Sequence, residues 1–254
     1  MARRTPEGPP PPPIVQRVRI RYTKRGRLRF TSHRDFARAF ERALRRADVP
    51  MAYSAGFSPH PKISYVGAAP TGVASEGEYL EIGLAREVDL ETLKHDLDAA
   101  LPDGLDIVDV VLAGPGSFAA RMEASHWRIE FPTLASATLS SAVTQFLALD
   151  EVPVERLTKD GRRNLDARGP VVSAVVSASG GTAADEERAI LDLVVRQVTP
   201  AVRPDDVLTA LRVVAGLAPD TVPLAVRVAQ GPLDDSGAVG DPLAPDRVGT
   251  GLSS

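Results

Sequence analysis

The chain has 254 residues, of which 43% are hydrophobic and 25% charged. This composition is typical of a soluble globular protein with one large domain or two of about 100–120 residues each. The sequence contains no cysteine, which excludes disulfides, iron–sulfur clusters and Cys-ligated zinc. No apolar run approaches the roughly 20 residues that span a bilayer. The first thirteen residues lack the apolar core of a secretory signal, so we expect a cytoplasmic protein without membrane contact.

The charge of the chain is unevenly distributed, although its net value is only −3. Between residues 14 and 65, thirteen Lys and Arg stand against three acids. Between residues 66 and 120, two basic residues stand against eleven acids. Solubility does not require such blocks, and a basic segment attracts polyanions locally even in a mildly acidic protein.

The first half carries strand and helix signals in the order β-α-β-β-α-β. Apolar and basic residues alternate over 15–23, which predicts a strand that continues or returns at 28–30. A cap at Thr31 or Ser32 opens an amphipathic helix that runs to about Asp48. The remaining expected elements are strands at 51–55, 78–85 and 105–112 and a helix at 90–101 capped by Asp89.

The second half repeats this order without residue-level identity. Its expected strands are 126–131, 152–158, either 165–167 or 171–176 beyond a Gly-containing turn, 189–198 and 223–229, and its helices are 139–149 and 204–216. We therefore predict an α+β protein of two tandem ferredoxin-like domains, over 14–115 and 120–230. The Pro-rich residues 1–13 and the Gly, Pro, Asp and Ser-rich residues 231–254 are expected to be disordered tails.

The most basic element is the helix that follows Ser32. Arginines spaced by four lie on the face opposite its apolar stripe, and few acids accompany them. Like charges at this spacing repel one another until an anion binds. A solvated helix face is the simpler interpretation, and phosphate binding is the functional one. The candidate nucleic-acid contacts are Arg17, Arg19, Arg21, Arg34, Arg38, Arg42, Arg45 and Lys62.

Two short motifs contain the candidate acid and base. The segment TSHRD places His33 at the helix N-terminus, where backbone N–H groups favour an anion. The segment GFSPHPKISY places His60 between Pro59 and Pro61, which fix the backbone on both sides of it. The alternative interpretation of TSHRD is a helix cap, and that of GFSPHPKISY is a rigid structural crossover. The candidate loop and stacking residues are Tyr53, Gly56, Phe57, Pro59, Pro61 and Tyr65.

No sequence motif indicates a cofactor or a metal. Glu76, Glu78 and Glu81 could ligate a hard cation, but an acidic strand edge explains them better. The segment LTKDGRRN is most simply a hairpin turn whose arginines could extend an RNA track. The chain has no phosphate-binding glycine loop, no dinucleotide fingerprint and no common hydrolase motif.

Residues 29–82, with the pieces FTSHRD, GFSPHP and GVASEGEY, resemble the radical SAM-linked family of unknown function. Residues 154–171 and 203–211 are similar to the second half of that family. The resemblance implies a stand-alone bacterial member or an accessory subunit, because the chain lacks the cysteines of a radical SAM cluster. It supplies no activity or catalytic residue.

Three functions remain open on the sequence. The first is an RNA-binding accessory protein in RNA processing or modification, which grips RNA with the basic helix face and the 56–62 loop. The second is a metal-independent ribonuclease or RNA-modifying subunit with His33 and His60 as acid and base. The third is an interaction module for a radical SAM protein or a ribonuclease.

Overall fold

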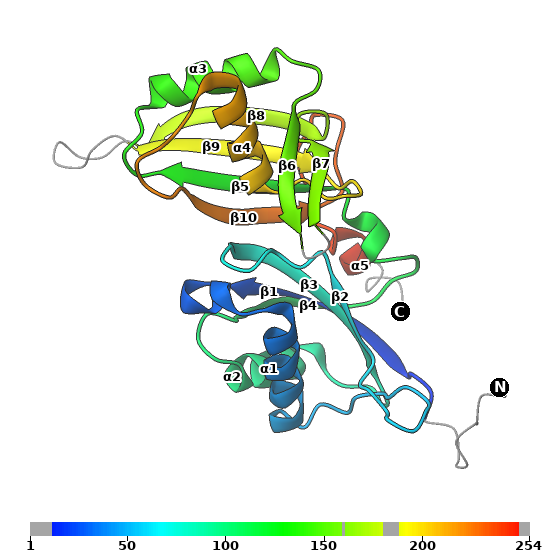
Figure 1. Cartoon of the computed structure of the whole chain (residues 1–254). Coiled ribbons are helices and arrows are strands. Elements are labelled where there is room, and N and C mark those ends of the chain that lie inside the picture. The colour runs from blue at the N-terminus through cyan, green and yellow to red at the C-terminus, as the bar shows by residue number, and fades with distance from the viewer. Residues whose placement is uncertain (1–11, 159–160, 180–187, 249–254) are drawn as a thin grey trace. The chain divides into compact units, whose positions relative to one another are not determined.

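A computed structural model describes residues 12–158, 161–179 and 188–248. The chain divides into two compact units (Figure 1). The first comprises the chain up to Ala120 together with the segment from Pro242 onward, and the second runs from Arg121 to Asp241. Within the described ranges, no helix is long and apolar enough to cross a membrane. The α+β class is confirmed. Residues 1–11 of the predicted N-terminal tail lie outside the described residues.

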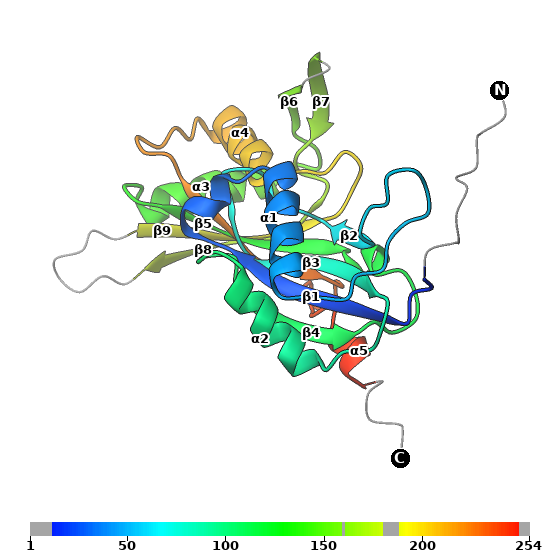
Figure 2. The same ribbon diagram turned by 90° about the horizontal axis from the view of Figure 1, so that it is seen from below.

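The first unit is an antiparallel sheet with two helices on one face (Figures 1 and 2). β1 pairs with β3 and β4, and β2 pairs with β3, which gives the order β4-β1-β3-β2. Its elements are β1 (Gln16–Lys24), the 3-10 turn η1 (Gly26–Phe30), α1 (His33–Arg46), β2 (Ile63–Val66), β3 (Ala74–Leu84), α2 (Leu90–Ala100), β4 (Ile107–Leu112) and α5 (Ala244–Val248). A short 3-10 turn, η2 (Ala119–Arg121), follows β4 in the sequence.

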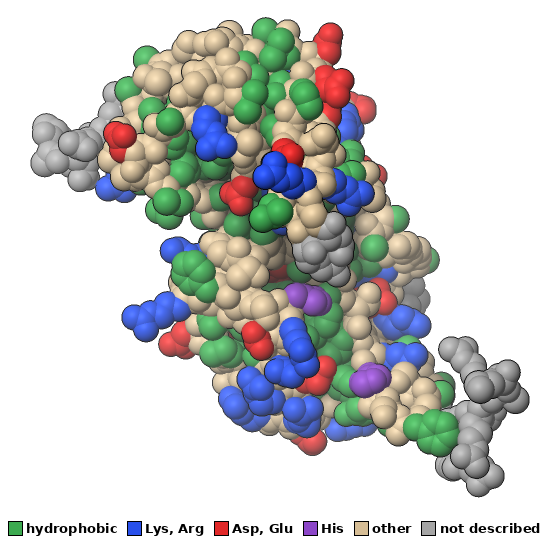
Figure 3. Space-filling model, in the orientation of Figure 1, with side chains coloured by type: hydrophobic (Ala, Val, Ile, Leu, Met, Phe, Trp, Pro, Cys, Tyr) green, Lys and Arg blue, Asp and Glu red, His purple; other side chains and the backbone are tan. Residues whose placement is uncertain are grey.

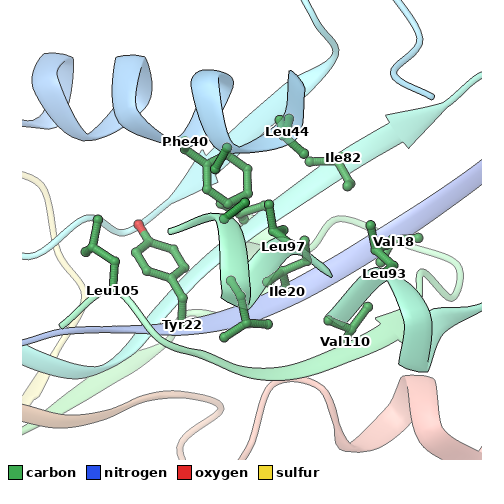
Figure 4. Packing of buried hydrophobic residues seen from close by; sticks show 14 of the residues in the cluster. Val18, Ile20, Tyr22, Phe40, Leu44, Ile82, Leu93, Leu97, Leu105 and Val110 are labelled. Carbon is green, nitrogen blue, oxygen red and sulfur yellow. The ribbon is translucent and has the colours of Figure 1, made fainter. Parts of the chain in front are cut away.

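The apolar stripe of α1 positions this helix on the sheet. The predicted cap is confirmed, since the hydroxyl of Ser32 accepts a hydrogen bond from the backbone N–H of Asp35 at 3.2 Å. Phe36, Phe40 and Leu44 are buried against the apolar side chains of the sheet (Figure 4). Each buried side chain of this size contributes about 1.5–3 kcal/mol. The opposite face of α1 is thereby directed to solvent.

The predicted strand over 51–55 is wrong. That segment makes an isolated bridge from Met51 to Leu84, and the strand that joins the sheet is β2. The chain leaves the sheet edge after Ala52 and returns at Lys62, whose backbone N–H donates to the carbonyl of Ala52 at 2.8 Å. β2 fits the edge better because its alternating Ile63 and Tyr65 pack against the core below α1.

The predicted disordered tail from residue 231 is wrong as far as residue 248. Asp246 is 3% exposed and accepts two hydrogen bonds from the buried guanidinium of Arg19, at 2.8 and 2.9 Å. Leu243 is fully buried beside it in the chain. Composition did not reveal this contact because it depends on a partner 227 residues away.

The second unit has a sheet of the same strand order and two helices on one face (Figure 1). Its antiparallel pairs give β10-β5-β9-β8. The elements are β5 (Ala124–Phe131), α3 (Ser136–Leu147), β6 (Pro153–Thr158), β7 (Gly161–Asp166), β8 (Val171–Ser179), β9 (Arg188–Arg196), α4 (Pro204–Ala215) and β10 (Leu224–Gly231). The sequence left two candidates for the strand beyond the Gly-containing turn, 165–167 and 171–176. Residues 171–176 belong to β8 of this sheet.

The strand at 152–158 was expected to belong to the main sheet, and this is wrong. β6 and β7 form a separate two-stranded hairpin. Arg156 fastens the hairpin to the start of α4, because its guanidinium lies 2.9 Å from the carboxylate of Asp206 and also donates to the carbonyl of Ala201. Lys159 and Asp160 of the hairpin turn lie outside the described residues.

The carboxylate of Asp166 organises the chain on both sides of this hairpin. It accepts hydrogen bonds from the backbone N–H groups of Val152, Arg168 and Gly169 at 2.9, 2.8 and 2.8 Å. Partial burial opposes the charged form, but these three bonds outweigh it and hold the pKa of Asp166 below its ordinary value.

We expect Asp246→Ala to lower the free energy of unfolding by about 3 kcal/mol, at the lower end of the cost of breaking a buried ion pair because Glu81 still faces Arg19. Urea denaturation followed by circular dichroism measures this. Asp103→Ala, at an exposed carboxylate of the same unit, is the matched control. Equal stability of the two variants would contradict the role of the Arg19–Asp246 pair.

We expect Asp166→Ala to destabilise the protein by about 1 kcal/mol at pH 7, because three backbone donors lose an ionised acceptor. A carboxylate with a lowered folded pKa stabilises above its unfolded pKa of about 3.9 and loses this contribution as the pH falls through the folded value. The difference from wild type should therefore shrink below pH 4, as measured by urea denaturation across pH. The exposed Asp150→Ala is the control; a difference that persists unchanged in acid contradicts the prediction.

Candidate nucleic-acid interface

Four arginines form one exposed surface on α1, here called the α1 arginine face: Arg34, Arg38, Arg42 and Arg45. Figure 3 shows basic side chains gathered over this helix. The face exists because the buried stripe of Phe36, Phe40 and Leu44 occupies the other side of the helix. The neighbouring Arg46 is tied down, since it donates to the carbonyl of Ala100 at 2.9 Å.

Few carboxylates neutralise the α1 arginine face. Asp35 lies 3.9 Å from Arg38 and also accepts a hydrogen bond from the hydroxyl of Ser32 at 2.7 Å. Across residues 12–158, 161–179 and 188–248, no ion pair is formed by Arg34, Arg42 or Arg45. These guanidinium groups present their donors to solvent, which is the state in which they can bind phosphate oxygens.

The arginines of β1 are placed differently, and Arg19 cannot contact nucleic acid. It is 1% exposed, and its guanidinium binds Asp246, Glu81 at 3.0 Å and the carbonyl of Gly116 at 3.1 Å. The sequence prediction for Arg19 is wrong because the register of β1 and β3 places Glu81 directly opposite it.

Arg17 and Arg21 are also engaged. Arg17 is exposed but pairs with Glu81 at 3.2 Å, and Arg21 donates to the backbone carbonyl of Glu76 at 3.0 Å. The carboxylate of Glu76 itself binds Arg25. Of the three glutamates that could ligate a cation, Glu76 and Glu81 therefore bind arginines of β1 and of the residue after it, and Glu78 accepts a hydrogen bond from the backbone N–H of Ala69 at 3.1 Å. Among the described residues, no group of three His, Asp or Glu side chains is placed to hold a metal ion.

An exposed aromatic side chain next to the α1 arginine face was missed in the sequence. Phe30 is 59% exposed, and the guanidinium of Arg29 lies over its ring at 4.7 Å. Its place two residues before the helix cap Ser32, among arginines, is the signal that could have identified it. An exposed ring at this position is a surface on which a base can stack.

His33 and Tyr65 lie together on the helix side of the sheet. The ring of His33 meets that of Tyr65 edge-on at 4.9 Å, and Tyr65 also packs edge-on against Phe36 at 5.8 Å. The hydroxyl of Tyr65 is buried and has no hydrogen-bond partner among the residues that the structure describes. Burial, with a smaller contribution from Glu41, raises the pKa of Tyr65 above its ordinary value. Because it is packed between His33 and Phe36, Tyr65 is less suited to base stacking than predicted.

The 56–62 loop is exposed and held at its base. The backbone N–H of Ser54 donates to the carbonyl of His60 at 2.8 Å, and the N–H of His60 donates to the hydroxyl of Ser54 at 3.0 Å. Gly56 has a φ of 134°, a conformation that other residues rarely adopt. Phe57, which follows Gly56, is 74% exposed, and Tyr53, which precedes it, is 41% exposed, so both can contact a ligand.

The two candidate catalytic histidines are directed to different sides of the sheet. His33 contacts Tyr65, which shares the core face of β2 and β3 with Leu80. His60 lines a cavity with Arg17 and Glu81, which are on the opposite face. The structure therefore does not assemble them into one acid/base pair.

Comparison with known proteins identifies a family but no activity. The search of curated proteins gives no match. A crystal structure of an unknown protein from Galdieria sulphuraria is 16% identical, with 78% of this chain and 91% of the other covered and a TM-score of 0.24. DyPB from Rhodococcus jostii is 14% identical, with 80% and 84% covered and a TM-score of 0.20. A model of the family described as "Uncharacterized protein conserved in bacteria (DUF2344)" matches residues 17–204, and the chain belongs to this family.

Proposed function

We propose that this protein binds RNA through the α1 arginine face. The observation that carries this proposal is a set of four exposed arginines on one side of a single helix, of which, among the described residues, only Arg38 lies within ion-pair distance of a carboxylate, that of Asp35 at 3.9 Å. Such a surface is mildly unfavourable without a ligand, since like charges four residues apart cost about 0.2–0.5 kcal/mol per pair. Binding a polyanion relieves this repulsion and releases condensed counterions.

The geometry around the α1 arginine face favours RNA with unpaired bases. The guanidinium groups supply sequence-independent phosphate contacts, while Phe30 offers a ring beside the start of the helix. Bases displayed in loops and single strands stack on exposed aromatic rings, whereas bases inside a duplex do not. We therefore propose an RNA-binding accessory protein whose ligands are loops or single strands. Its place in RNA processing or modification is part of the same proposal.

A ribonuclease reaction that uses both histidines has less support. His33 and His60 contact opposite faces of the first sheet, and an acid and a base must reach the same phosphodiester. An association with a radical SAM protein or with a ribonuclease stays a prediction from the sequence, and no contact of the described residues favours it.

We infer that both units have the ferredoxin-like arrangement. The support is the matching strand order, β4-β1-β3-β2 in the first unit and β10-β5-β9-β8 in the second, with two helices on one face of each sheet. In the second unit the β6–β7 hairpin is then an insertion between the first helix and the second strand.

The triple variant Arg34→Gln, Arg38→Gln, Arg42→Gln is expected to bind single-stranded RNA more weakly than wild type. The slope of log affinity against log salt should also become shallower by about 2, because each phosphate contact on a single strand contributes about 0.7. Fluorescence anisotropy of a labelled RNA, titrated from about 50 mM salt upward, measures both quantities.

The matched control changes three exposed arginines elsewhere, Arg86, Arg196 and Arg212, to Gln. It removes the same charge and should keep the larger part of the affinity and the slope. Wild-type protein that fails to bind RNA near 50 mM salt, or two triple variants that lose affinity equally, would refute the proposed interface.

A further inference from the structure

A cavity of about 340 Å³ lies beside the 56–62 loop in the first unit and is here called the loop cavity. Its volume is at the lower end of the range of about 300–1,000 Å³ that is usual for small-molecule sites. Strands and loop contribute its polar lining: Arg17, Ser54, His60, Lys62, Ser64 and Glu81.

The charge of the loop cavity suits an anion. Glu81 is its one carboxylate, and this group already binds Arg17 at 3.2 Å and Arg19 at 3.0 Å. Across the described part of the chain, the ammonium of Lys62 and the imidazole of His60 make no hydrogen bond or ion pair. The cavity therefore presents one uncompensated cation and a second nitrogen donor.

The backbone that carries Lys62 is held in place before a ligand arrives. The backbone of Lys62 is paired on both sides, since its N–H donates to Ala52 and its carbonyl accepts from Gly83 at 2.9 Å. A Cβ at position 83 would meet the Cδ1 of Ile14 at 3.0 Å and the Cβ of Lys62 at 3.3 Å. Because residue 83 is glycine, the side-chain carbons of Lys62 can pack closely against β3. A backbone that is already fixed loses little entropy on binding.

Hydroxyl groups complete the set of donors. The Oγ of Ser54 accepts from the N–H of His60 and keeps its own hydrogen available, and Ser64 is exposed at the cavity. A tetrahedral dianion accepts several hydrogen bonds from such a mixture of ammonium, guanidinium, imidazole and hydroxyl groups.

We propose that the loop cavity binds a phosphate monoester, with Lys62 as the principal charge contact and His60, Arg17 and the two serines as further donors. The site is separate from the α1 arginine face, and the proposal does not depend on RNA binding there. The phosphate belongs either to a free nucleotide or to the 5′ end of an RNA. Both present the same terminal dianion.

Isothermal titration calorimetry of the full chain with inorganic phosphate and with adenosine monophosphate tests the site. Wild type and Lys94→Gln, a variant at a lysine of α2 outside the cavity, should bind alike, whereas Lys62→Gln should bind at least about tenfold more weakly. Circular dichroism verifies that each variant is folded. The proposal is overturned by the absence of saturable binding at about 10 mM ligand, or by equal affinities of the two lysine variants.

Two RNAs of one sequence, with a 5′ phosphate and with a 5′ hydroxyl, identify the source of the phosphate. A preference for the phosphorylated RNA that Lys62→Gln abolishes supports the site as an RNA-end pocket. Binding of adenosine monophosphate without that preference supports it as a nucleotide pocket. The Arg34, Arg38 and Arg42 triple variant should keep phosphate binding even where it loses RNA, so the two proposals can fail separately.

Discussion

The first unit depends on the ion pairs and hydrogen bonds that the buried guanidinium of Arg19 makes. This guanidinium lies at the centre of a strand, is almost wholly buried, and binds carboxylates from β3 and from the C-terminal segment as well as the carbonyl of Gly116. A buried charge is tolerated only when its donors are satisfied, so these segments must be placed together. The ring of Phe118, 4.7 Å below the guanidinium, closes the remaining side.

This arrangement explains the charge blocks of the sequence. The basic residues of β1 and the acidic residues of β3 lie side by side, so that Arg17 and Arg19 share Glu81 and Arg25 takes Glu76. These arginines of the basic block are thus balanced by acids of the first unit. The arginines of the α1 arginine face are not, because the apolar side of that helix is buried, its polar side is exposed, and among the described residues only Arg38 of this face has an ion pair. The net charge of a segment is therefore a poor guide to the charge that a ligand can reach. In the first unit, the exposed arginines of α1 supply such charge.

Local patterns predicted the local structure well. The Ser32 and Asp89 caps, the apolar stripe of α1 and the alternating strands are read from a few neighbouring residues, and the structure confirms them. Two local predictions were wrong, since residues 28–30 belong to the 3-10 turn η1 and residues 51–55 form no strand. The other errors concern partners distant in sequence. The sequence around Arg19 predicts a ligand contact because Glu81 and Asp246 are far from it in the chain. The polar composition after residue 231 predicts a tail, although Leu243 and Asp246 are buried.

The interleaving of the two units has a consequence for the order of folding. Arg19 and Asp246 are 227 residues apart, and the whole second unit lies between them in the sequence. At about 5–20 residues per second, Asp246 leaves the ribosome roughly 10–45 s after Arg19. Although it begins the chain, the first unit is thus completed last. During synthesis the guanidinium of Arg19 therefore lacks the carboxylate of Asp246 until the C-terminal segment has been made.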